Sequence, residues 1–171
     1  MSKVKSIRVI TLAGLFTALG TVLGLVGKIP ITSLIEIRFQ SIPVKLAGAL
    51  LGPYLGGIVG ALTDILAYLV KPTGPFFPGF TLSSLATGVI FAFFLHGKKF
   101  ALPRVIAAEA VITGAIGLCL NSFWLSLLYK TPFLVSVISR APKELIMLPI
   151  NIALVYGAGK AVSGVMGKIE Q

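Results

Sequence analysis

Long apolar runs, broken only by short groups of proline, glycine and charged residues, extend through the whole sequence. Several approach the roughly 20 residues that an α-helix needs to cross the hydrocarbon core of a bilayer. Charged residues make up 12% of the chain, whereas soluble domains carry about 25%. We therefore expect a single all-α integral membrane domain over residues 1–171.

The apolar runs predict six transmembrane helices, which would put both termini on the same side of the membrane. The first run follows Lys3, Lys5 and Arg8, an arrangement that resembles a signal peptide. We reject that interpretation because the run is about a full membrane span long and no clear cleavage site follows it. The predicted helices cover about residues 6–27, 42–51, 53–70, 79–96, 102–129 and 141–163.

The segment between the first two predicted helices has a different pattern. Residues Ile35–Phe39 alternate apolar and polar side chains, which is typical of a β-strand. A strand whose backbone groups are unpaired is not stable inside lipid. We therefore expect a short strand-like loop at the membrane surface, folded over the helices as a lid.

A proline-rich corner, Lys71–Ser83, separates two of the apolar runs. It contains three prolines, two glycines and three phenylalanines, among them Phe77. Proline lacks a backbone N–H and clashes with a helical turn, so a helix cannot continue through this segment. The segment is also too apolar for an ordinary solvated loop. It predicts a rigid, aromatic-lined corner between two helices, of the kind that holds a flat ligand.

Polar residues inside the apolar runs are candidate binding residues, because a charge at membrane depth needs a partner or a ligand. Asp64 lies in the third predicted helix, and Tyr68 follows one turn later on the same face. Alternatively, Asp64 lies near the helix end and reaches headgroup water. Asn121 and Trp124 lie near the end of the fifth helix. Trp124 is either an interfacial anchor or a ring that stacks on a ligand.

The last predicted helix carries a polar stripe. Arg140, Glu144, Met147 and Asn151 are spaced at i, i+4, i+7 and i+11, which places them on one face, and Lys143 lies beside them. Arg140 and Glu144 could form only an i, i+4 ion pair at the membrane edge. Asn151 lies two turns deeper, so the stripe also fits a binding site.

The formal net charge of +10 indicates an anionic partner, which is either lipid headgroups or an anionic substrate. The predicted topology divides the basic residues almost equally between the two sides, so the positive-inside rule barely decides the orientation. Basic residues on the outer side work against that rule, which suggests that they serve another purpose. They are Lys28, Arg38, Lys45, Lys71, Lys130, Arg140 and Lys143.

The sequence lacks the common motifs of enzymes: it has no His-Glu-x-x-His, no Gly-x-Ser-x-Gly and no glycine-rich phosphate loop. A metal site is not expected, because His96 is the only histidine and no second ligand type lies near it. The basic-aromatic pattern of a nucleic-acid reader is also absent. We expect a carrier or a binding subunit rather than an enzyme.

Small residues form a stripe along the first predicted helix. Lipid gives little hydrophobic drive between helices, so small residues that permit close approach mark where helices join. The stripe packs either within the chain or against another subunit. Its members and their neighbours are Ala13, Gly14, Thr17, Ala18, Gly20 and Gly24. Two further small-residue pairs are Gly48 with Gly52 and Gly56 with Gly60.

Four segments carry a resemblance to a known family: Ile37–Pro53, Gly56–Asp64, Pro72–Leu82 and Arg140–Ile150. They resemble the substrate-binding S components of energy-coupling factor (ECF) vitamin transporters, and the folate-specific subgroup is the closest. The Pro-Gly-Phe-Thr-Leu sequence and the last of the four segments are the most specific parts. The resemblance covers nearly the whole chain.

The resemblance implies a bacterial multi-pass protein of the cell membrane, with six helices, cytoplasmic termini and an outward-facing vitamin site. It also implies docking onto a transmembrane T subunit that carries two ATPases, so this chain needs no cofactor and the partners use the ATP. Family members dock through small residues of the first helix. The nearest matches here are Ala13 with Thr17 and Gly14 with Ala18. The loaded subunit would tip over in the membrane and release the vitamin inside.

A folate has chemical groups that this sequence could match. Its flat pterin needs aromatic ring faces, its amino and ring N–H groups form a donor pair that suits a carboxylate, and its glutamate tail suits cationic side chains. The stacking candidates are Phe39, Tyr68, Phe76, Phe77 and Trp124. Asp64 is the first choice for the donor pair and Glu144 the second. The tail candidates are Arg38, Lys130, Arg140 and Lys143, and Asn151 extends the same polar stripe.

Other interpretations stay open. The chain could be an S component for another small anionic vitamin or for a queuosine precursor. It could also be a small ion-coupled carrier that acts alone. An intramembrane enzyme using Asp64 with Glu109 or Glu144 is a further alternative, although nothing in the spacing of these residues demands a shared site.

Overall fold

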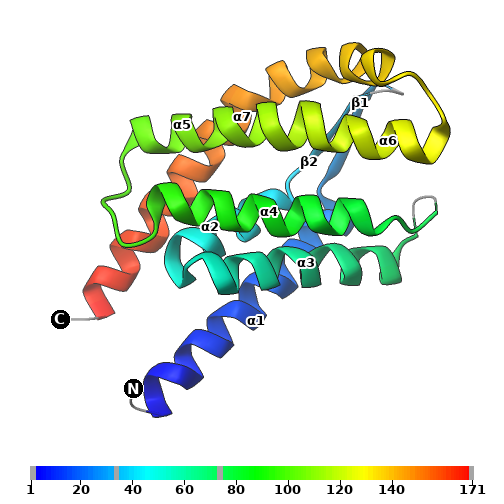
Figure 1. Ribbon diagram of the computed structural model, residues 1–171. Helices are drawn as coiled ribbons and strands as arrows, with labels where there is room; N and C mark the ends of the chain where they lie inside the picture. Colours follow the sequence, from blue (N-terminus) through cyan, green and yellow to red (C-terminus); the bar gives the residue numbers. More distant parts are fainter. Residues whose placement is uncertain (1–2, 33–34, 73–74, 170–171) are drawn as a thin grey trace.

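Helices form most of the chain, and α5, η1 and α6 follow one another as a single continuous stretch (Figure 1). The computed structural model describes residues 3–32, 35–72 and 75–169, with side chains for residues 7–27, 39–72 and 75–162. The helices are α1 (Lys3–Val26), α2 (Ser41–Leu51), α3 (Pro53–Val70), α4 (Pro78–Leu95), α5 (Leu102–Val111), η1 (Ile112–Leu120), α6 (Asn121–Tyr129) and α7 (Phe133–Ile169).

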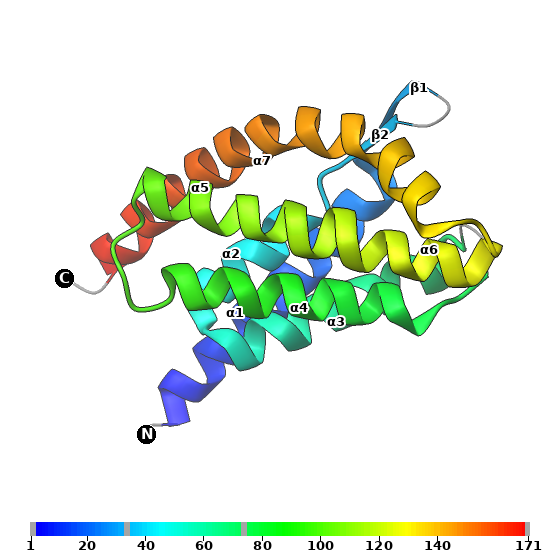
Figure 2. The ribbon, with the colours of Figure 1, turned by 45° about the horizontal axis from the view of Figure 1, so that its top comes forward.

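Within the described residues, five helical stretches are long and apolar enough to cross a membrane, so the chain is an all-α integral membrane protein. They are Ile7–Val26, Pro53–Val70, Pro78–Leu95, Leu102–Tyr129 and Phe133–Val162. α2 is shorter, with 11 residues. At 1.5 Å per residue it spans roughly 16 Å, about half of a hydrocarbon core. The two termini lie at the same end of the bundle (Figures 1 and 2).

Glycines bring α2, α3 and α4 into close contact. A Cβ atom added at Gly56 would lie 2.5 Å from the Cα of Gly48, and one added at Gly88 would meet the carbonyl oxygen of Gly56. One added at Gly60 would meet the carbonyl of Ser84, whose hydroxyl donates a 2.8 Å hydrogen bond to the Gly60 carbonyl. Membrane helices associate by such close approach. The predicted packing roles of Gly48, Gly56 and Gly60 are confirmed.

Two clusters of buried apolar side chains hold the helices together. One joins α4, α5 and α7 through Phe91, Leu95, Val105, Ala108 and Val155, and the other joins α1, α2 and α3 through Phe16, Leu46, Ala47 and Val59. Outside these clusters, large apolar side chains such as Leu62 and Phe93 are exposed. Lipid tails are as apolar as leucine, so this exposure suits a membrane surrounding.

The long helical stretch Leu102–Tyr129 is wider in its middle than an α-helix. Nine residues, Ile112–Leu120, form the π-helix η1, whose backbone hydrogen bonds join residues five apart. Such turns are rare and frequently lie at functional sites. The apolar pattern of the sequence gave no sign of this segment.

The last helix begins earlier than the sequence predicted. The prediction placed its start near residue 141, with Pro142 in the first turn, where proline is tolerated. Instead α7 begins at Phe133 and contains both Pro142 and Pro149. Membrane helices tolerate internal proline because neighbouring groups satisfy the freed backbone carbonyls. Figure 2 shows α7 arching over the bundle, and proline is a common cause of helix bending.

A two-stranded hairpin lies at the end of the bundle away from the termini (Figures 1 and 2). Its strands are β1 (Lys28–Thr32) and β2 (Ile35–Arg38), which pair antiparallel with Ile29 opposite Ile37. The sequence indicated one strand at Ile35–Phe39. The second strand supplies the hydrogen-bond partners that a lone strand would lack.

Candidate ligand-binding site

A cavity of about 450 Å³ lies between the helices, toward the end of the bundle where α3 ends and α4 begins. Its walls come from α2, α3, the proline-rich corner, α4, η1, α6 and α7. The polar residues in its lining are Gln40, Ser41, Asp64, Tyr68, Lys71, Ser83, Ser84, Thr87, Asn121, Tyr129, Arg140, Lys143, Glu144 and Asn151.

The short α2 makes room for this cavity. Gly48 lies against Gly56, and Val44 lies close to Gly60, so α2 begins beside the middle of α3 rather than at its end. Ser41, the first residue of α2, therefore lines the cavity instead of extending to the end of the bundle. A full-length helix at this place would fill the space.

Asp64 lines the cavity and is held by α4. The hydroxyl of Thr81 donates a 2.8 Å hydrogen bond to its Oδ2 atom. Asp64 is partly buried and lies in the wall of the cavity among other polar groups. A charged group in a membrane segment is expected to be arranged in this way when it serves a ligand.

The predicted polar stripe of α7 also lines the cavity. Arg140, Lys143, Glu144, Met147 and Asn151 all contribute to its wall. The Nη2 atom of Arg140 lies 3.3 Å from Oε1 of Glu144, with exposed fractions of 21% and 16%. The i, i+4 ion pair therefore exists, but it lies inside the cavity and not on the lipid-facing side of the helix.

Aromatic rings line the part of the cavity nearest the proline-rich corner. Tyr68 and Phe76 lie with ring centroids 5.0 Å apart. Phe77 also lines the cavity, and the ring of Trp124 lies 5.6 Å behind it. The indole N–H of Trp124 donates a 3.1 Å hydrogen bond to Ser83. Trp124 therefore supports Phe77 instead of forming the cavity wall.

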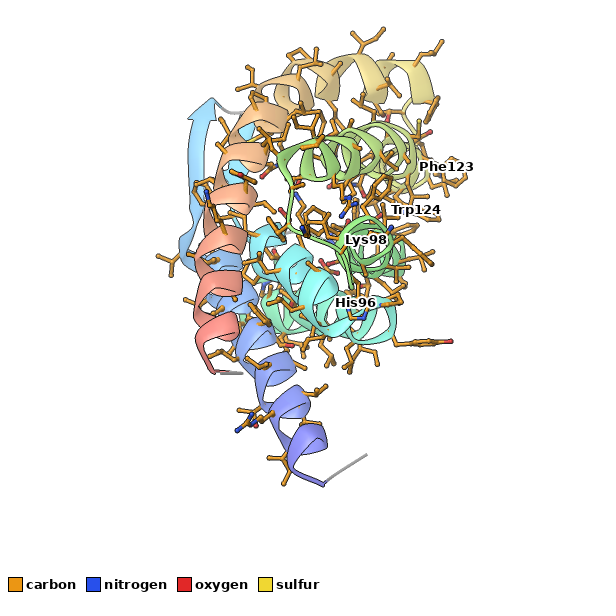
Figure 3. The ribbon with its side chains drawn as sticks, turned by 90° about the vertical axis from the view of Figure 1, so that its left-hand side faces the viewer. His96, Lys98, Phe123 and Trp124 are labelled. Atoms are coloured by element: carbon orange, nitrogen blue, oxygen red, sulfur yellow. The ribbon has the colours of Figure 1, made fainter. Side chains whose placement is uncertain are left out.

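Figure 3 shows how differently the two neighbouring aromatics of α6 lie. Trp124 is turned toward α4, whereas Phe123 points away from the bundle and is 47% exposed. A Cβ atom added at Gly79, in the first turn of α4, would lie 2.5 Å from the Trp124 ring. The Pro-Gly start of α4 thus provides the flat surface on which this indole lies.

One predicted tail-binding residue, Lys130, does not belong to the cavity lining, and another, Arg38, cannot be placed against it. Lys130 is exposed and ends α6 in a left-handed conformation with φ 53°. The side chain of Arg38 lies outside the described side chains, although its backbone belongs to β2. The basic residues that line the cavity are Lys71, Arg140 and Lys143.

Three buried polar atoms of the cavity lining have no hydrogen-bond partner in the described part of the chain. They are Oδ1 of Asn121, Oδ1 of Asn151 and Nε of Arg140. A buried polar atom left without a partner costs about 1–3 kcal/mol. Two acceptors and one donor are therefore available for a ligand at the same place.

The sequence did not indicate a smaller chamber of about 150 Å³ beneath the main cavity. Ser41, Thr87, Asn121, Glu144 and Asn151 border both spaces. The lower chamber also contacts a buried ion pair between Lys45 and Glu109. From the sequence, Lys45 was expected among the outer basic residues, and no partner was predicted for Glu109. A signal was present, because both residues interrupt apolar helices and neither can stay charged there alone.

The small residues of α1 divide between two faces. Thr17 is 7% exposed, and Ala13 packs against the buried cluster of Phe16, so these two are occupied by packing within the chain. Gly14 and Ala18 are exposed, and a Cβ atom added at Gly14 would meet nothing within 4 Å.

In the described part of the chain no group of three metal-ligating side chains occurs.

Comparison with known proteins identifies the family. The family model described as "ECF transporter, substrate-specific component" matches residues 8–158. The chain is 41% identical over 142 residues to the folate transporter FolT of Clostridium novyi (strain NT), covering 82% of this chain and 83% of that protein. It is 38% identical over 136 residues to the biotin transporter BioY of Rhodobacter capsulatus, covering 69% and 70% of the two chains.

A solved structure of FolT bound with folic acid superposes with a TM-score of 0.80 and 32% sequence identity, covering 89% of this chain and 92% of that one. The family match, the curated relatives and this structure agree with the resemblance that the sequence motifs carried. The chain belongs to the substrate-specific components of ECF transporters.

Proposed function

We propose that this chain is the folate-binding subunit of an ECF-type importer, which takes up folate from outside the cell and passes it inward. The observation that carries the proposal is the likeness of nearly the whole chain to FolT bound with folic acid. The cavity described above is large enough to be a ligand site, because such sites typically measure about 300–1,000 Å³.

The polar groups of the cavity suit the two ends of a folate. Oδ1 of Asn121 and Oδ1 of Asn151 are acceptors without partners, and the Glu144 carboxylate lies in the same region. All three border the lower chamber as well. We assign this deeper region to the pterin, whose amino and ring N–H groups are donors. Asp64 then lies beside the ligand, where Thr81 fixes one of its oxygens.

The cationic side chains suit the glutamate tail. Lys71, Arg140 and Lys143 line the main cavity but not the lower chamber. Arg140 has a buried Nε atom without a partner in addition to its contact with Glu144. A guanidinium can donate two parallel hydrogen bonds to one carboxylate, which gives both strength and orientation. Tyr68 and Phe77 offer aromatic faces beside the path of the ligand.

We further propose that the chain crosses the membrane six times, with α2 as a half-length crossing. The termini would then both be cytoplasmic, and the hairpin would cover the outer opening of the site. Transport itself would use a T subunit and two ATPases as partners, so this chain is a binding subunit without catalysis. The exposed Gly14 and Ala18 are the residues of α1 that remain available for this contact.

Direct titration of folate into the purified chain in detergent tests the proposed function. We expect saturable one-to-one binding that a large excess of biotin does not displace. Biotin is the matched competitor because a biotin transporter is also among the relatives. Displacement by biotin, or no heat of folate binding, would reassign the ligand.

The proposed tail contact is tested with Arg140→Ala. Because this change removes a cavity-lining guanidinium, we expect folate to bind at least ~10-fold more weakly, which corresponds to about 1.4 kcal/mol. Lys130→Ala is the control, since Lys130 is exposed and absent from the cavity lining. Equal affinities for both variants and the parent chain would remove Arg140 from the site.

A further inference from the structure

A buried ion pair lies at the bottom of the ligand site. Nζ of Lys45 donates a 2.9 Å hydrogen bond to Oε2 of Glu109 and lies 2.8 Å from Oε1. The two side chains are 1% and 0% exposed. Both residues border the lower chamber, which shares several lining residues with the main cavity.

A buried ion pair is an energetically unfavourable way to join α2 and α5. Burying two charges costs more solvation than their attraction usually returns, and apolar residues of similar volume often replace such pairs without loss of stability. The surrounding contacts of α5 are already apolar, through Val105 and Ala108 in the buried cluster. Packing alone therefore does not account for charges at this place.

The pair reaches across a space that the helices do not close by themselves. α5 packs on α4 and α7, and Lys45 approaches it from α2 beside the lower chamber. Glu109 lies three residues before the π-helix η1. The contact with Lys45 therefore fixes the position from which η1 starts.

The π-helix carries ligand-site residues directly after this anchor. In an ideal α-helix, Glu109 and Asn121 would be 12 residues or roughly 3.3 turns apart and would point in different directions. The wider turns of η1 advance the chain by a smaller angle per residue, and both side chains border the same chamber. Gly117 of η1 lies so close to Glu144 that an added Cβ would be 2.7 Å from its Oε2 atom.

We infer that Lys45 and Glu109 are positioning residues of the ligand site. Their ion pair ties α5 to α2 and so fixes where η1 starts, so that Asn121 presents its acceptor oxygen to the ligand and Gly117 leaves room for the Glu144 carboxylate. Neither residue needs to touch the ligand. Loss of the pair should therefore weaken ligand binding even where the fold is as stable as before.

The test measures ligand affinity and fold stability separately. Folate is the ligand used, because the inference rests on the proposed function. The main variant is Lys45→Met with Glu109→Leu, which removes both charges and keeps apolar volume. We expect its thermal midpoint without ligand to stay within about 4 °C of the parent chain, while its folate dissociation constant rises at least ~10-fold. The exchanged pair, Lys45→Glu with Glu109→Lys, should recover most of the affinity, because the bridge between α2 and α5 is restored.

Lys98→Met is the matched control. Lys98 lies on the exposed connection after α4 (Figure 3), where its ammonium donates to the Phe93 carbonyl. Lys98→Met should change neither the thermal midpoint nor the folate dissociation constant.

The outcomes are decisive in each direction. A stable apolar variant that binds folate as tightly as the parent chain would overturn the inference, because the pair would then be structural only. If the apolar variant does not fold, the exchanged pair decides: affinity within about threefold of the parent supports positioning, and a tenfold loss contradicts it. Failure of both variants to fold would assign the pair to folding. If the parent chain itself binds no folate, the proposed function fails separately.

Discussion

Contact with the cavity, and not an unpaired buried atom alone, distinguishes Asn121 from its neighbour Ser122. Asn121 and Ser122 are adjacent on α6, and each has a buried side-chain oxygen without a partner in the described part of the chain. Asn121 lines the cavity, whereas Ser122 does not and is fully buried. A ligand in the cavity could therefore supply the missing hydrogen-bond partner to Asn121 but not to Ser122.

Asn121→Leu should consequently change folate affinity, whereas Ser122→Ala should change only the stability of the fold, if anything. Asn121→Leu removes an acceptor that we assign to the pterin, so folate affinity should fall at least ~10-fold. Ser122→Ala removes a buried hydroxyl that has no partner, so stability should be unchanged or higher by about 1 kcal/mol and affinity should not change. Isothermal titration and thermal unfolding of the two variants check this, and a loss of affinity in Ser122→Ala alone would contradict the assignment.

The residues of the site were more predictable than their arrangement. Polar groups are costly at membrane depth unless they have a partner or a ligand. That argument, together with the aromatic corner, predicted Asp64, Tyr68, Phe77 and the α7 stripe, and all of them line the cavity. Trp124 also stood out, but sequence spacing cannot show that its ring packs against Phe77 and is absent from the cavity lining. The pairing of Lys45 with Glu109 joins residues 64 positions apart, and no local pattern predicts such a contact.

Elements were predictable where apolar length and helix breakers agreed. The Gly-Pro junction between α2 and α3 and the Pro-Gly start of α4 are such places. Gly52, which was expected to join helices, instead ends α2 with φ 92°, a conformation that favours glycine. The start of α7 and the π-helix η1 were not predictable, because proline inside a helix and extra helix width depend on neighbouring helices rather than on local sequence.

Close contact among α2, α3 and α4 predicts a sharp difference between two glycines. A methyl group at Gly88 would collide with the backbone of Gly56, which cannot move without separating the helices. Such overpacking costs about 1–3 kcal/mol, so Gly88→Ala should lower the thermal midpoint by roughly 3–10 °C. At Gly114 nothing lies within 4 Å of the added atom.

Gly114→Ala is therefore the control for Gly88→Ala. Alanine in a helix is favoured over glycine by about 0.5–1 kcal/mol, so this midpoint should stay the same or rise. Differential scanning fluorimetry of both variants in one detergent gives the comparison. Equal midpoints would show that the three helices adjust to an added methyl group and are not fixed by their glycines.

In the molecule as a whole, one end of the bundle encloses the cavity and another part remains uncovered. The first half of α1 projects away from the other helices (Figures 1 and 2). Apart from Arg8, the exposed side chains described on this face of α1 are apolar or small, including Ile10, Gly14, Leu15 and Ala18. The cavity lies at the opposite end of α1, where Gly24 reaches its lining. Ligand binding and partner contact can therefore be changed separately.

Gly14→Leu with Ala18→Leu should abolish transport without affecting the ligand site. Large side chains on this face prevent the close helix approach that small residues allow in lipid, whereas Thr17 and the inner face of α1 stay intact. We expect an unchanged folate dissociation constant and an uptake rate at least ~10-fold lower, equivalent to about 1.4 kcal/mol of docking, when the chain is reconstituted with the proposed T subunit and ATPases. The control is Ala107→Leu, which changes another exposed small residue, on α5, and should transport normally. If the α1 variant also transports normally, the T subunit binds another face, and the exposed small residues of α1 serve no docking role.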